Sequence, residues 1–172
     1  MERLISQARK GDPDAFTALM ESQMQNMYKV ARSILSRDED VADAISDTIL
    51  VCWEKIDTLK KNRFFRTWMT RILINKCNDI LRAGQRTVFT DEPLEIEYME
   101  NEFLNLEWKE MLQSLDEKYR IVLLLYYGEG FSIKEIAQIL ELTESAIKSR
   151  LSREREQVKQ EYNAGGICHE KS

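Results

Sequence analysis

The amino-acid sequence predicts an all-α protein with two small helical domains joined by an acidic linker. Only 2 Pro and 6 Gly occur in 172 residues, whereas a sandwich or barrel needs turn residues at intervals of ~8–12. Apolar residues make up 43% of the chain and recur at helical spacing on both sides of a polar segment that contains Pro93. We expect domains at 1–86 and 105–162, a linker at 87–104 and a disordered tail at 163–172.

The first two long helices have clear starts. Asp12 is a good N-cap and Pro13 suits the first helical position. A second helix begins at Asp38, and its apolar stripe is predicted to contain Val41, Ile45, Ile49, Cys52, Trp53 and Ile56. Its opposite face carries a polar set that, taken alone, is typical of a solvated helix surface: Asp43, Ser46 and Asp47.

The third helix combines cations with large aromatic side chains, from Arg63 to Arg71. Two interpretations are open. Arginines beside aromatic rings bind single-stranded nucleic acid, where stacking contributes ~1–3 kcal/mol per base. Alternatively, Phe65 and Trp68 belong to the core and the arginines only solubilise the helix, which is the interpretation that this segment alone favours.

The overall charge hides two opposite segments. The chain has 25 Lys and Arg against 30 Asp and Glu, a formal net charge of −5. Residues 60–86 nevertheless sum to +7, and residues 87–110 sum to −7. An acidic mean charge therefore does not exclude a nucleic-acid ligand, because the cations are concentrated in one helix.

The second domain has the pattern of a helix-turn-helix. A helix from Asp116 through Tyr127 is followed by a capping box, Ser132 with Glu135. A short turn then leads to Thr143 as the next N-cap. The last helix exposes short hydroxyls and cations that can reach base edges in a major groove, which favours DNA binding over an ordinary helical hairpin. This exposed set is Ser145, Lys148, Ser149, Ser152 and Arg153.

Several classes of protein do not fit the sequence. The longest apolar run, Ile121 to Tyr127, has seven residues, far short of the ~20 that span a bilayer. Three scattered cysteines and one histidine, His169, form no zinc or disulfide pattern. We find no catalytic constellation, and we expect a soluble, cytoplasmic protein without enzymatic activity, metal or cofactor.

Taken together, residues from about 5 to 162 resemble bacterial RNA polymerase sigma factors of the extracytoplasmic-function group. Each matching stretch is weak alone, but their order across both domains is specific. The stretches are 11–16, 39–48, 65–72, 132–137 and 148–153. In this family, two helical domains and a connecting linker constitute the whole protein.

The resemblance implies a role for each face. The residues implied to contact the clamp helices of the largest polymerase subunit are Asp43, Ser46 and Asp47. Ser46 stands where the family usually has Gln. The minus-ten element would be bound and melted by Arg63, Phe64, Arg66, Trp68, Arg71, Asn75, Lys76 and Arg82. The minus-thirty-five element would be read by Thr143, Ser145, Lys148, Ser149, Ser152 and Arg153. Glu141 stands in the turn where many relatives have Gly.

The implied function is promoter-specific initiation of transcription in response to envelope or extracellular stress. The implied partners are core RNA polymerase, promoter DNA and an anti-sigma factor, often membrane-anchored in this family, with no small-molecule substrate. Two other functions fit the helices: a helix-turn-helix activator with a ligand-binding or dimerisation lobe, and a helical adaptor whose turn motif is fortuitous.

Overall fold

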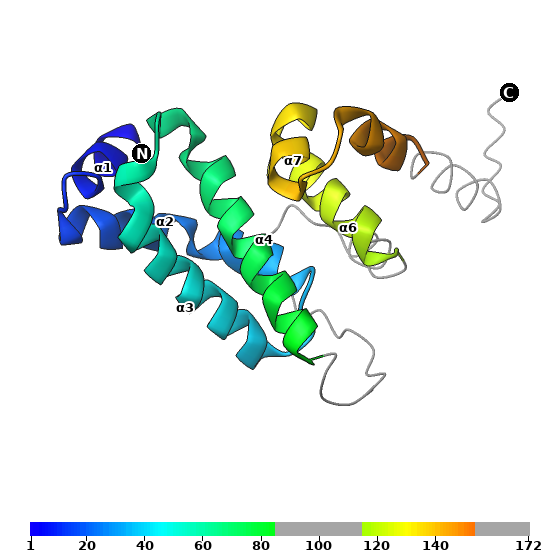
Figure 1. Cartoon of the computed structure of the whole chain (residues 1–172), viewed down its shortest axis with the longest axis horizontal. Helices are drawn as coiled ribbons and strands as arrows, with labels where there is room; N and C mark the ends of the chain where they lie inside the picture. Colours follow the sequence, from blue (N-terminus) through cyan, green and yellow to red (C-terminus); the bar gives the residue numbers. More distant parts are fainter. Residues whose placement is uncertain (85–114, 154–172) are drawn as a thin grey trace, which may run out of the picture.

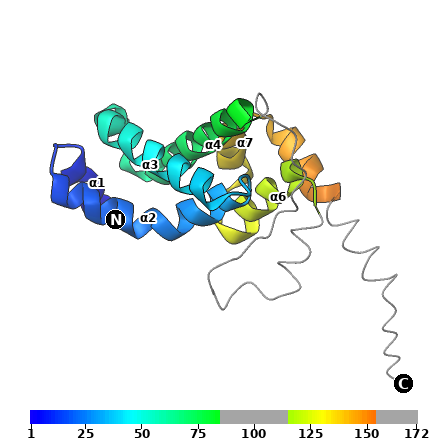
Figure 2. The ribbon, with the colours of Figure 1, turned by 90° about the horizontal axis from the view of Figure 1, so that it is seen from below.

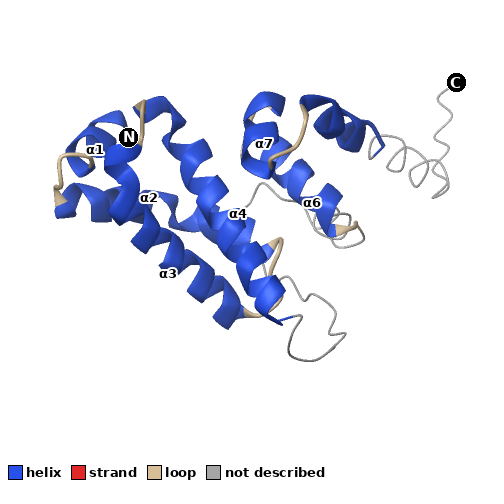
Figure 3. Cartoon of the chain, viewed as in Figure 1, coloured by secondary structure: helices blue, strands red, loops and turns tan. Residues whose placement is uncertain are grey.

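The structure is a computed structural model that describes residues 1–84 and 115–153. Within these ranges every regular element is a helix (Figure 3), which confirms the all-α prediction. The predicted linker at 87–104 and tail at 163–172 lie outside the described residues. The N-terminal lobe contains α1 (Glu2–Ala8), α2 (Pro13–Arg32), α3 (Asp38–Lys55), η1 (Ile56–Thr58), η2 (Asn62–Phe64) and α4 (Phe65–Gly84).

The C-terminal lobe is smaller and also helical. It contains α6 (Glu117–Leu123), the π-helical turn η3 (Leu124–Gly128), α7 (Ile133–Leu140) and a helical segment at 144–153. The helix predicted to run from Asp116 through Tyr127 is therefore present, but its second half widens to π geometry. Such a turn has backbone hydrogen bonds between residues i and i+5, which are uncommon inside helices.

Local hydrogen bonding explains where α2 begins. The Asp12 carboxylate accepts from the backbone N–H groups of Asp14 and Ala15, at 3.1 and 3.0 Å. Pro13 follows as the first helical residue, where its missing N–H costs nothing. Gly11 precedes the cap with φ +87°, a conformation that glycine adopts without a steric penalty.

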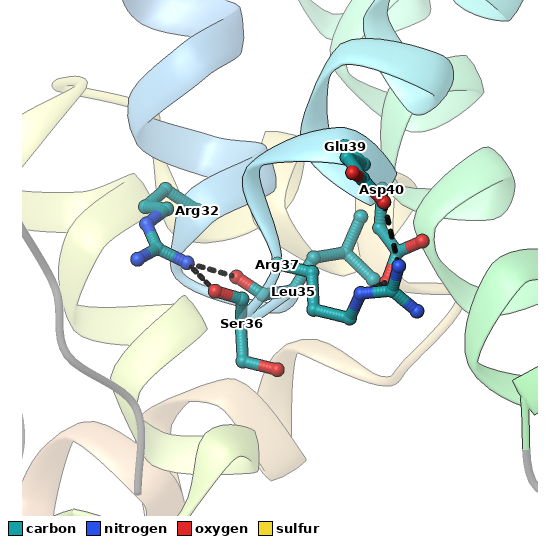
Figure 4. A network of polar contacts seen from close by, with 6 residues as sticks. All are labelled: Arg32, Leu35, Ser36, Arg37, Glu39 and Asp40. Carbon is teal, nitrogen blue, oxygen red and sulfur yellow. Dashed lines mark hydrogen bonds and ion pairs between the residues drawn. The ribbon is translucent and has the colours of Figure 1, made fainter. Parts of the chain in front are cut away.

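A buried arginine fixes the junction between α2 and α3 (Figure 4). Arg32 donates from Nη1 to the backbone carbonyls of Leu35, at 3.2 Å, and Ser36. The first turn of α3 follows at once, and there Arg37 pairs with Glu39 at 2.6 Å. Leu35 and Ser36 lie in the connection between the two helices, so the guanidinium at the last residue of α2 satisfies carbonyls of that connection.

Each lobe has apolar side chains that are fully buried. In the N-terminal lobe, α3 packs against both α2 and α4, and the most deeply buried side chains there include Leu19, Met27, Phe65, Met69 and Leu73. In the C-terminal lobe they include Leu124, Leu125, Ile136, Ile139 and Ile147.

The two lobes lie side by side, with α4 between α3 and α7 (Figures 1 and 2). Arg120 of α6 is buried and crosses the boundary. Its Nη1 donates to the carbonyl of Ser33, at the end of α2, at 3.3 Å, and its Nη2 donates to the carbonyl of Leu115 at 2.8 Å. A charged group from one lobe therefore satisfies a helix end of the other.

The buried cysteines give a test of this packing. Burial raises the pKa of the Cys52 and Cys77 thiols from 9.0 to about 12, so both stay protonated and unreactive in the folded protein. We expect iodoacetamide at pH 8 to modify both slowly in native protein and rapidly in urea, as followed by peptide mass spectrometry. Equal rates in the two conditions would contradict the packing.

The same pKa shift has a consequence for stability. The folded state holds these two thiol protons more tightly than the unfolded state does, so the free energy of unfolding falls as pH rises from 9.0 toward 12.

Candidate nucleic-acid and polymerase interfaces

The aromatic residues at the start of α4 divide between core and surface. Phe65 is fully buried, and Trp68 is partly buried with its ring centroid 6.2 Å from that of Phe65. Phe64, in η2, is 40% exposed, and the guanidinium of Arg63 lies 4.7 Å from its ring centroid. Phe65 therefore has the core role that the second interpretation gave it, whereas Phe64 and Arg63 present a ring and a cation to solvent.

The remaining cations of α4 lie beside carboxylates, two of which belong to the C-terminal lobe. Arg66 pairs with Glu129 at 3.4 Å, and Arg71 pairs with Glu141. Further along, Lys76 Nζ lies 3.9 Å from a carboxylate oxygen of Asp47 on α3. Arg82 lies 3.4 Å from Asp79 within α4.

Asn75 differs from these cations because its amide can both donate and accept hydrogen bonds. It is exposed, one helical turn after Arg71. The structure thus places an exposed ring in η2, directly before α4, and several cations and one exposed amide along α4.

The predicted polymerase-binding residues lie on α3. Asp43, Ser46 and Asp47 are all exposed. The pair between Asp47 and Lys76 joins this group to the predicted DNA-binding residues of α4.

The exposed face of α3 also includes apolar residues that sequence reasoning did not assign to it. Leu50 is 61% exposed and Trp53 is 43% exposed. The placement of Trp53 in the core stripe was wrong: its ring meets Phe16 edge-on, with centroids 5.0 Å apart, at the margin of the core. Both follow Asp47 at helical spacing, and that spacing was the available signal.

The start of α7 is a complete capping box, as predicted. The Ser132 hydroxyl accepts from the N–H of Glu135 at 3.3 Å, and the N–H of Ser132 donates to the Glu135 carboxylate at 2.9 Å. Burial alone would raise the pKa of Glu135, but hydrogen bonds from Ser132 and from Thr67 of α4 outweigh it and lower that pKa. The cap therefore favours the ionised carboxylate.

The turn between the last two helices contains a strained residue. Glu141 has φ +55° and ψ +40°, and it is the only residue other than glycine with positive φ in 1–84 and 115–153. Thr143 then caps the following helix, since its hydroxyl accepts from the N–H of Ala146 at 3.1 Å. This confirms Thr143 as an N-cap, and the turn adopts the conformation that glycine would adopt at less cost.

The last helix has the two faces that its sequence predicts. Ile147 and Leu151 are buried. The predicted DNA-reading residues are all exposed: Thr143, Ser145, Lys148, Ser149, Ser152 and Arg153. Arg153 is not isolated, because its Nη1 donates to the Tyr119 hydroxyl at 3.4 Å. An exposed row of hydroxyls and cations on a capped helix is suited to a DNA groove.

Two findings concern what the described residues do not contain. In 1–84 and 115–153, no three side chains of the His, Cys, Asp and Glu types gather closely enough to hold a metal ion. Over the same residues, none of the helices combines the length and apolar character needed to span a membrane.

Two sequence families match the two lobes. Sigma-70 region 2 matches residues 19–87, and sigma-70 region 4 matches residues 105–158. Among curated proteins, the chain is 26% identical to the ECF RNA polymerase sigma factor SigW of Bacillus subtilis (strain 168), with 94% of this chain and 96% of the relative covered. It is 28% identical to the ECF RNA polymerase sigma-E factor of Escherichia coli (strain K12), with 90% of each covered.

Solved structures agree in fold. CnrH in complex with the cytosolic domain of CnrY has a TM-score of 0.68 at 26% identity, covering 96% of this chain and 98% of that chain. The sigma factor RpoE in complex with the anti-sigma factor NepR, from Bartonella quintana, has a TM-score of 0.68 at 24% identity, covering 84% and 94%. With regions 2 and 4 matched in order and full-length relatives of one kind, the chain belongs to the sigma-70 family of RNA polymerase sigma factors, in its extracytoplasmic-function group.

Proposed function

We propose that this sigma factor docks on core RNA polymerase through α3, reads the minus-thirty-five element through helix 144–153 and captures the unpaired minus-ten element through α4. The observation that carries the proposal is the coexistence of two different exposed surfaces in one chain. One combines a ring and a cation of η2 with cations and an amide of α4, and the other combines hydroxyls and cations on a capped helix. Sigma-70 regions 2 and 4 match the two lobes that carry these surfaces.

The α4 surface suits single-stranded DNA. Phe64 offers a face on which a base can stack, and Asn75 can bind the edge of a base that has left the duplex. The cations Arg63, Arg66, Arg71, Lys76 and Arg82 would hold the backbone. Because binding an unpaired strand offsets the cost of unpairing, capture on α4 would itself favour strand opening.

The helix 144–153 suits duplex DNA. Its exposed hydroxyls and cations can contact base edges and phosphates in a major groove. The buried residues Ile147 and Leu151 hold this helix against the rest of the lobe. In this division of labour, residues 1–86 bind polymerase and the minus-ten element, residues 105–162 bind the minus-thirty-five element, and the segment 87–104 connects them.

Docking on polymerase would use the exposed face of α3. Asp43, Ser46 and Asp47 offer charge and hydrogen bonds, and the exposed side chains of Leu50 and Trp53 add apolar area to the same helix. A polar rim around apolar side chains is the usual composition of a protein interface. The proposed activity is recruitment and melting without covalent chemistry, in the cytoplasm, where the polymerase acts.

Regulation by a protein partner is the second part of the proposal. The solved structures of CnrH and RpoE each hold a partner, the cytosolic domain of CnrY and the anti-sigma factor NepR. We infer that an anti-sigma factor also restrains this chain and releases it in response to envelope or extracellular stress.

Run-off transcription tests the proposed function. Purified core polymerase is given the protein and a library of genomic promoter fragments, and transcript starts are mapped. The proposal predicts transcripts that depend on the added protein and share two upstream elements. Their absence would favour a helix-turn-helix activator or a helical adaptor, neither of which supports initiation by core polymerase alone.

We expect Phe64→Ala and Asn75→Ala to impair strand opening. Each removes a contact to an unpaired base, so open-complex formation, measured by permanganate reactivity, should fall by about tenfold or more, since a stacked base contributes ~1–3 kcal/mol. Duplex binding by the holoenzyme should be nearly unchanged. Tyr127→Ala removes an exposed ring from the other lobe and serves as the control. Equal loss of both functions would contradict the separate roles of the lobes.

We expect Lys148→Ala and Arg153→Ala to weaken recognition of the minus-thirty-five element. Loss of a base or phosphate contact costs ~1–3 kcal/mol when the contact is specific, and the loss should disappear on a promoter with a scrambled minus-thirty-five element. Lys134→Ala removes one exposed cation from α7 and is the matched control. If Lys134→Ala weakened binding as much, charge alone would explain the effect.

A further inference from the structure

The turn that presents the Phe64 ring has little core packing of its own. Within residues 60–64, all side chains except that of Asn62 are exposed, and η2 contains no buried residue and no side-chain cap. The buried residues Leu59 and Phe65 flank this stretch on either side. A helical turn of three residues is not stable by itself. The conformation of η2 therefore depends on what its first residue, Asn62, contacts.

The side chain of Asn62 is held by α1, which lies 53 to 60 positions earlier in the chain. Arg9 donates from Nη1 to Asn62 Oδ1 at 3.0 Å. The Nδ2 of Asn62 donates to Ser6 Oγ at 2.7 Å and to the backbone carbonyl of Glu2 at 3.5 Å. The acceptor and the donor of one amide are thus both used by the same short helix.

These hydrogen bonds are not what attaches α1 to the lobe. Ile5 and Ala8 of α1 are buried in the core, and apolar burial of this kind supplies the driving force for packing. Hydrogen bonds add direction, because they require particular distances and angles. The Arg9 Nε is buried without a hydrogen-bond partner among the described residues, so the Nη1 contact with Asn62 matters the more to this guanidinium. We conclude that the polar contacts of α1 determine where η2 lies.

The position of Asn62 is passed on to the ring by the backbone of the turn. The N–H of Phe65 donates to the Asn62 carbonyl, and the N–H of Phe64 donates to the Lys61 carbonyl at 3.0 Å. The Phe64 ring is 40% exposed, and the guanidinium of Arg63 lies 4.7 Å from its centroid. A displacement of Asn62 would therefore move the ring and the cation that follow it directly.

We propose that Ser6, Arg9 and Asn62 are positioning residues for strand capture, which hold η2 in the shape in which the Phe64 ring receives an unpaired base. The inference rests on the proposed DNA-binding role of Phe64. A base stacks on a ring only when the ring is presented in the right orientation. A turn that samples several shapes binds in proportion to the fraction of time it spends in the competent one. In this account α1 contributes to strand opening through η2.

A double-mutant cycle between α1 and the ring tests the inference. Open-complex formation by the holoenzyme is measured by permanganate reactivity, on a promoter identified by run-off transcription. We expect Arg9→Ala and Asn62→Ala each to lower it by roughly three- to tenfold, since each removes a hydrogen bond that holds the turn. In a Phe64→Ala background the same changes should have less than about a twofold effect, because the ring that they position is absent.

Matched variants separate positioning from charge and from unfolding. Arg3→Ala removes an exposed cation from the same helix and should leave open-complex formation unchanged, whereas Arg9→Lys keeps a donor and the charge and should retain most of it. Urea unfolding of the free, full-length protein shows which variants are folded under the assay conditions. Ser6→Ala removes only one hydrogen bond of the Asn62 amide, so it gives the same test, with a smaller loss, if Asn62→Ala does not fold.

The outcomes distinguish this inference from the proposed function. Loss of strand opening with duplex binding retained, and no such loss in the Phe64→Ala background, supports positioning. Equal losses in both backgrounds, equal effects of Arg3→Ala and Arg9→Ala, a parallel loss of duplex binding, or normal strand opening by Asn62→Ala would overturn the inference and leave the role of the ring intact. Strand opening that is insensitive to Phe64→Ala would refute the role of the ring itself, and the inference with it.

Discussion

The contact between Arg66 and Glu129 is the buried ion pair that joins the two lobes. Glu129 is buried, and burial raises the pKa of its carboxyl even with Lys29 and Arg66 nearby. The carboxylate therefore depends on a cation supplied by the N-terminal lobe, and that cation belongs to the helix that we assign to the minus-ten strand. One guanidinium thus joins the packing of the two lobes to the helix that we assign to DNA.

The charge pattern of the sequence has a structural meaning of the same kind. A net charge of −5 conceals a segment of +7 at residues 60–86. Four of the cations in that segment lie beside carboxylates from Asp47, Asp79, Glu129 and Glu141. These pairs balance part of the charge of α4 within the chain. The mean charge is a poor guide to the ligand because it averages over a basic segment and an acidic one.

Local features could be predicted from the sequence, and distant pairings could not. Asp12, the Ser132 capping box and Thr143 depend on hydrogen bonds between residues at most three apart, so residue type and spacing suffice. Arg66 and Glu129 are 63 positions apart, and nothing in either segment specifies the partner. Trp53 was misplaced because one face of α3 has more apolar residues than the core can cover, and only packing against α2 decides which remain outside.

The central claim, that α4 captures the unpaired non-template strand of the minus-ten element, is tested most directly by photo-cross-linking. A photoreactive base is placed in the minus-ten element of the non-template strand, and the cross-linked peptide is identified by mass spectrometry for the free protein and for the open complex. The account predicts strong cross-links to the segment from Phe64 to Asn75 in the open complex and weak ones in the free protein. Cross-links in the open complex confined to the C-terminal lobe would contradict it.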